Sequence, residues 1–277
     1  MNFRSSTLTA GLALVCLSAF AAEEEDSKPT IASAPLSPAE VDAAVKIDSL
    51  SIPTPGELLA ALNKLGKLDW GAKIRPPVLL NMPSRAQMAL NLGGLVADGY
   101  IAVEAENSQQ VKNIGKDILT LGKSLGVSKE ILDRGKSLTE FAEGKQWDVL
   151  KEELEATQNE VKSALERNKD FDLINLVTLG GWVRSVEVLS GWIGEHYSEP
   201  GAKLLRQPGI AALLEKGLAD LPAKTREENI VKKTQAKLTD IKAAVSFPAG
   251  TTPTVEQIKA LNKLATDLMN DLSKKDK

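Results

Sequence analysis

Hydrophobic residues recur at every third or fourth position along most of the chain from residue 84 onward, a spacing typical of one face of an α-helix. Val111, Ile114 and Ile118 share such a face, in a helix that Gly126 should end. The same pattern predicts helices over residues 84–106, 108–126, 128–143, 145–168, 171–197, 225–245 and 254–274. Short helices are expected among the prolines between residues 200 and 222, and segments with the alternation of β-strands are hard to place anywhere.

Residues that favour helix N-termini precede several of these segments. A Ser or Thr followed three positions later by Glu or Gln can form a capping box. Such pairs occur at Ser37/Glu40, Thr54/Glu57, Ser84/Gln87, Thr225/Glu228 and Thr254/Gln257. The first two predict short helices ahead of the main pattern. The segment 70–83 contains three prolines and should cross the surface as an extended connector.

The predicted fold is therefore all-α, an irregular multi-helix bundle of roughly seven to ten helices with a C-terminal antiparallel helical hairpin at residues 225–274. Residues 84–277 are predicted to form the bundle domain, with the hairpin included. Residues 37–83 supply the two short helices and the Pro-rich connector. Residues 22–36, which are acidic and rich in Pro and Ala, should form a flexible leader.

The N-terminus has the pattern of a cleaved signal peptide over residues 1–21. Arg4 precedes an apolar run, and Ala19 and Ala21 are the small residues that a signal peptidase accepts. The mature chain should begin at Ala22 and lack Cys16, the only cysteine. We therefore expect an exported protein, periplasmic or secreted, in a bacterial envelope. After the signal, no apolar stretch reaches the length of about 18 residues that a transmembrane helix needs.

Composition excludes several function classes. A net charge of -3 gives no electrostatic basis for binding nucleic acid. A mature chain without cysteine and with one histidine, His196, has no thiolate chemistry and no multi-histidine metal site. No phosphate loop, dinucleotide fingerprint or Gly-x-Ser-x-Gly elbow occurs, so neither a cofactor nor a catalytic residue is predicted.

The most promising place for a binding site is the segment 84–106, which is almost wholly apolar yet contains Asn91 and Asp98. Seven residues make nearly two helical turns, so both side chains should share a face, with Gly94 between them. One interpretation is a crevice in which both residues bind a ligand. The other is a buried aspartate that pairs with an arginine and fixes the register of two helices.

Arg184 is the candidate partner of Asp98. The small residues at Gly93 and Gly181 predict that segments 84–106 and 171–197 cross closely near these glycines, by analogy with small-xxx-small packing. The helical wheel favours a different interpretation, because Arg184 lies largely away from the main apolar face and would then belong to a solvated charged stripe.

Two functions are compatible with these features. The first is a non-enzymatic binding or scaffold module whose partner is an unknown ligand or envelope protein. The alternative is a carboxylate-dependent hydrolase that uses Asp98 with Glu104 or Glu106, although neither acid shares a helix face with Asp98. The apolar stripe of the last helix is a candidate surface for self-association, unless the chain buries it.

Overall fold

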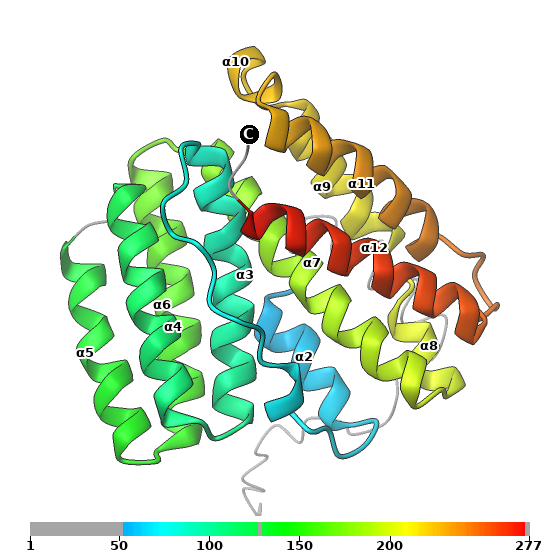
Figure 1. Cartoon of the computed structure of the whole chain (residues 1–277), viewed down its shortest axis with the longest axis horizontal. Coiled ribbons are helices and arrows are strands. Elements are labelled where there is room, and N and C mark those ends of the chain that lie inside the picture. The colour runs from blue at the N-terminus through cyan, green and yellow to red at the C-terminus, as the bar shows by residue number, and fades with distance from the viewer. Residues whose placement is uncertain (1–51, 127–128, 275–277) are drawn as a thin grey trace, which may run out of the picture. The chain divides into compact units, whose positions relative to one another are not determined.

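In the computed structural model, residues 52–126 and 129–274 are described, and they form helices and loops with no β-strand among them (Figure 1). The elements are α2 (Pro55–Asn63), the 3-10 turn η1 (Gly71–Lys73), α3 (Arg85–Glu104), α4 (Ser108–Ser124), α5 (Lys129–Glu143), α6 (Trp147–Arg167), α7 (Phe171–Glu195), α8 (Glu199–Leu204), α9 (Pro208–Ala219), α10 (Ala223–Arg226), α11 (Asn229–Val245) and α12 (Val255–Ser273). The all-α prediction is confirmed. The predicted signal peptide, the leader and the helix expected from Ser37 lie outside the described residues.

Helices α3, α4, α5 and α6 form a four-helix bundle. Each packs on the next in chain order, and α6 returns to pack on α3, which closes the ring (Figure 1). Short connections such as residues 105–107 and 144–146 place consecutive helices side by side in opposite directions. The ring surrounds an interior that is lined mainly by apolar side chains.

Helix α7 crosses α3 at very short range. A Cβ atom added to Gly93 would lie 1.8 Å from the carbonyl oxygen of Val177, and one added to Gly180 would lie 1.9 Å from that of Leu90. Only hydrogen fits at either position, so the two backbones touch without intervening side chains. The predicted crossing near the glycines is confirmed.

The hairpin of α11 and α12 packs on α7 and α9. The apolar stripe of α12 is buried within the chain along its whole length: Ile258, Leu261, Ala265, Leu268 and Leu272. Because the chain itself covers this stripe, it does not form an exposed surface for self-association.

Two predicted helix starts are confirmed with complete capping boxes, at Thr54/Glu57 and at Thr254/Gln257. Ser84 caps α3 through the backbone of Gln87. The prediction for Thr225/Glu228 is wrong. Pro222 starts the separate turn α10, which contains Thr225, and α11 begins only at Asn229; the Glu228 carboxylate instead accepts a hydrogen bond from the Ser84 hydroxyl.

The segment 70–83 begins with the turn η1 and is extended only after it, over the part that contains the prolines, and it is not merely a surface connector. Trp70, Val78 and Met82 are buried against the core. Its arginine, Arg75, points toward α3. The sequence interpretation missed this contribution because proline restricts backbone conformation and says nothing about where the side chains between the prolines point.

Candidate functional site

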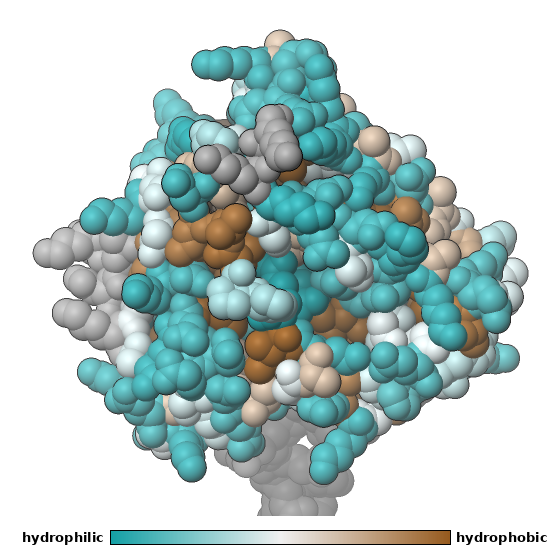
Figure 2. All heavy atoms as spheres, viewed as in Figure 1, coloured by the Kyte–Doolittle hydropathy of each residue, from teal (hydrophilic) through white to brown (hydrophobic). Residues whose placement is uncertain are grey.

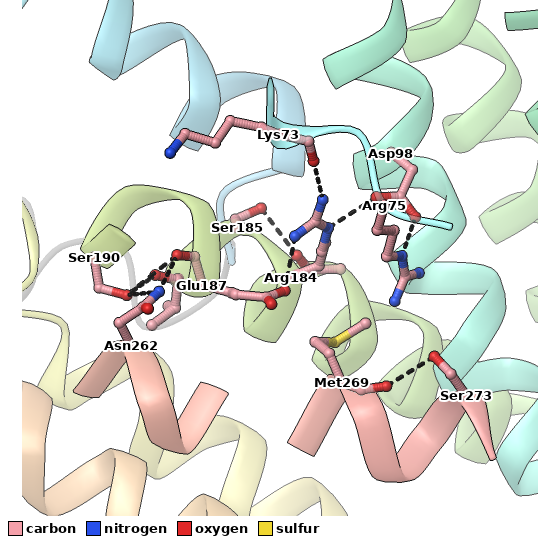
Figure 3. A network of polar contacts seen from close by, with 12 residues as sticks. Lys73, Arg75, Asp98, Arg184, Ser185, Glu187, Ser190, Asn262, Met269 and Ser273 are labelled. Atoms are coloured by element: carbon pink, nitrogen blue, oxygen red, sulfur yellow. Dashed lines mark hydrogen bonds and ion pairs between the residues drawn. The ribbon is translucent and has the colours of Figure 1, made fainter. Parts of the chain in front are cut away.

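Asp98 lies at the centre of a network of charged side chains between α3, α7 and the connector (Figure 3). Its Oδ1 accepts from Nε of Arg184 at 2.8 Å, and its Oδ2 accepts from Nε of Arg75 at 2.6 Å. Arg184 also donates to Oε2 of Glu187 at 2.7 Å and to the carbonyl oxygen of Lys73 at 2.6 Å. Two guanidinium groups thus face two carboxylates.

This network is almost completely removed from water. The side chains of Asp98 and Arg184 are only 6% and 5% exposed. Burial by itself lowers the pKa of the Arg184 guanidinium, but the carboxylates of Asp98 and Glu187 outweigh it and raise that pKa above its usual value. The ion pair holds α3 and α7 at one relative position, as the register interpretation predicts.

The helical-wheel argument placed Arg184 in a solvated stripe, and that interpretation is wrong. Helix α7 contacts α2, α3, α6, α9 and α12 and is therefore covered on several sides. A helical wheel assumes that a helix has one buried and one exposed side. This assumption does not hold for α7, which packs on other helices on several sides.

Asn91 is fully buried but does not join Asp98. Its Nδ2 donates to the carbonyl oxygens of Leu272 at 2.7 Å and of Gln87 at 3.0 Å. Nε2 of Gln87 donates to Leu272 and to Lys274, at 2.9 Å and 2.6 Å. The last carbonyl groups of a helix have no partners within it. Asn91 and Gln87 thus satisfy carbonyl groups at the end of α12.

We expect Asn91→Ala to lower the free energy of unfolding by about 0.5–1.5 kcal/mol, the net contribution of one hydrogen bond, because the Leu272 carbonyl loses one of its two side-chain donors and keeps Gln87. Amide hydrogen exchange near residue 272 should also become faster. Equilibrium unfolding and exchange measured by mass spectrometry test both effects. Gln109→Ala, which changes an exposed amide on α4, is the control and should alter neither. Equal stability of the two variants would contradict the assignment.

The predicted crevice between Asn91 and Asp98 is closed. A Cβ atom on Gly94 would lie 2.8 Å from Cε of Met269 and 2.9 Å from Nη2 of Arg75, so these side chains occupy the space that the glycine leaves. A cavity of only about 30 Å³ remains beside Asp98. That volume suits about one water molecule.

The same small cavity is lined by Asp117 of α4, which sequence analysis did not single out. Burial raises the pKa of the Asp117 carboxyl, and the neighbouring Lys116 opposes part of this shift. The acids considered as partners for Asp98 lie elsewhere. Glu104 pairs with Lys151 and accepts a hydrogen bond from Asn63, and Glu106 is exposed beyond the end of α3. Arrangements that depend on tertiary folding, such as that of Asp98 with Asp117, leave no signal in helical spacing.

A larger cavity of about 160 Å³ lies among the helices of the α3–α6 bundle, with α7 and residues 52–55 completing its wall. Its lining is mainly apolar and includes Leu92, Val96, Ile118, Leu138, Leu154 and Ile174. Asn159 and Lys162 of α6 are exposed lining residues and mark where the cavity reaches the surface. For comparison, an engineered apolar cavity of about 150 Å³ stays dry and binds benzene.

Glycines account for part of this space. A Cβ atom on Gly115 would meet no heavy atom within 4 Å, and one on Gly99 would meet its nearest neighbour only at 3.8 Å. The cavity also contains one unsatisfied polar group, since Oε1 of Gln158 is buried and has no hydrogen-bond partner among the described residues. An apolar chamber with one unsatisfied acceptor is typical of a site for a small ligand.

Elsewhere the chain gives fewer indications of a site. Figure 2 shows a mostly hydrophilic face, with hydrophobic residues in separate smaller groups. Within residues 52–126 and 129–274, no cluster of His, Cys, Asp and Glu is arranged to hold a metal ion. No helix in those two ranges is long and apolar enough to cross a membrane.

In comparisons with protein-family models, curated proteins and solved structures, none matches this chain.

Proposed function

We propose that the protein is an exported, non-enzymatic binding module of the bacterial envelope, and that it holds a small apolar ligand inside the α3–α6 bundle. The observation that carries this proposal is the cavity of about 160 Å³, which is lined mainly by aliphatic side chains and glycines. Pockets between the helices of a bundle are common sites for small molecules. Export is inferred from the pattern of residues 1–21 alone.

The alternative, a carboxylate-dependent hydrolase, gains little support from the geometry. Such an enzyme needs an accessible carboxylate beside a space large enough for a substrate. Both oxygens of Asp98 accept hydrogen bonds from arginines, and the adjoining cavity measures about 30 Å³. Asp98 and Arg184 therefore serve the proposed module as a structural ion pair, and Asn91 serves it as a helix-end contact.

Native mass spectrometry of protein purified gently from its host tests the proposal. We expect a chain that begins at Ala22 and carries a small adduct. Gly115→Leu should remove the adduct, because a leucine side chain at Gly115 would extend into the cavity. Ala212→Leu, which adds the same side chain at an exposed position of α9, should retain it.

A wild-type protein without an adduct that also takes up no apolar probe in solution would overturn the proposal. The comparison of adducts is valid only if Gly115→Leu is folded, which its circular dichroism spectrum should show by a helical signal equal to that of the wild type. If it does not, Gly115→Ala provides a smaller filler that open space around the Cβ atom should accommodate, with a partial loss of the adduct expected.

A further inference from the structure

The polar chemistry of the cavity narrows the class of ligand. Among the cavity-lining residues, Gln158 of α6 has a buried Oε1 atom that accepts no hydrogen bond from any described residue. Thr157, the preceding residue in the lining, does not donate to this oxygen. Its hydroxyl group donates instead to the carbonyl oxygen of Glu153, at 2.7 Å. Gln158 is therefore a free acceptor in apolar surroundings, where an unsatisfied oxygen is unfavourable.

We infer that the ligand is a small, uncharged, apolar molecule with one N–H or O–H group, which donates a hydrogen bond to Oε1 of Gln158. This inference rests on the proposed function, since it concerns the same cavity. The lining disfavours a charged ligand, because the described residues around Gln158 supply no buried counter-ion. The charged residue among them, Lys162, is exposed at the mouth. The volume of about 160 Å³ limits the ligand to roughly the size of one or two fused rings.

Indole and benzofuran form a matched pair of probes for this acceptor. They have nearly the same size and shape, but indole has an N–H donor where benzofuran has an oxygen. Isothermal titration calorimetry of the purified protein should give a dissociation constant for indole about tenfold lower than for benzofuran, the effect of one net hydrogen bond.

Gln158→Leu should abolish this preference, because leucine has a similar volume and no acceptor. The affinity for indole should fall about tenfold, to that for benzofuran. Gln109→Leu makes the same change on an exposed part of α4 and should leave the preference intact. A wild-type protein that binds both probes equally, or a Gln158→Leu variant that still prefers indole, would overturn this inference.

The two proposals fail in different ways. If both probes bind equally and Gly115→Leu weakens both, the cavity is a binding site and only the hydrogen-bond inference is overturned. If neither probe binds, or if Gly115→Leu leaves the affinity for both unchanged, the proposed function fails as well.

Discussion

Gly180→Ala is expected to reduce the free energy of unfolding by about 3 kcal/mol or more, at the upper end of what overpacking costs in a protein core. The added Cβ atom would lie 1.9 Å from the carbonyl oxygen of Leu90. Because that atom belongs to the backbone of α3, no side chain can rotate away to relieve the overlap. The two helices must instead separate by about 1 Å, which forfeits up to about half of the dispersion energy across their contact.

Gly115→Ala is the matched control, since it makes the same change inside a helix without a steric conflict. It should stabilise the protein by up to about 1 kcal/mol through helix propensity alone. Chemical denaturation measures both variants on one scale. Equal stabilities would mean that α3 and α7 do not approach as closely as described. Gly93→Ala should behave like Gly180→Ala, because its Cβ atom meets the carbonyl oxygen of Val177 at 1.8 Å.

Asp98→Ala is expected to cost about 3–5 kcal/mol, the usual result of removing one partner from a buried ion pair. Arg184 would retain the Glu187 carboxylate and the Lys73 carbonyl oxygen as acceptors, whereas Arg75 would lose its carboxylate partner. Asp98→Leu combined with Arg75→Met should recover much of the loss, because it removes the guanidinium group that has lost its carboxylate and leaves Arg184 paired with Glu187. Urea unfolding of the single and double variants, analysed as a mutant cycle, separates these contributions.

Asp267→Ala provides the control for this second experiment. Its partner Lys263 is 75% exposed, and surface pairs of this kind contribute at most about 1 kcal/mol. Ligand uptake distinguishes the two interpretations of Asp98. A folded Asp98→Ala variant that retains the adduct supports a purely structural role, whereas loss of the adduct would restore the earlier prediction of a binding site at Asn91, Asp98 and Arg184.

The sequence predicts helices and their starts well wherever the determining contacts are local. Thr54 and Thr254 each cap the helix that follows through residues three positions away, and those contacts need no knowledge of the tertiary fold. The close crossing at Gly93 is also predictable, since glycine within an apolar helix has few other uses. Thr225 shows the limit, because Pro222 allowed a separate turn to form first.

The candidate site was only partly predictable. The pairing of Asp98 with Arg184 follows from the glycine crossing, but the second arginine, Arg75, comes from a connector that has no periodicity to interpret. The cavity is harder still to foresee. It depends on the combined shape of five helices, and a position such as Gly115 resembles any other glycine within a helix until its neighbours are known.

The contacts of Gln87 and Asn91 with Leu272 have a consequence for the order in which the chain folds. They join residues that are 185 and 181 positions apart, and such long loops close late. At a synthesis rate of about 5–20 residues per second, Leu272 leaves the ribosome roughly 10–40 s after the side-chain amides of Gln87 and Asn91. The most apolar helix of the bundle therefore emerges well before its polar groups can be satisfied. A factor that shields nascent chains should thus improve the yield of folded protein.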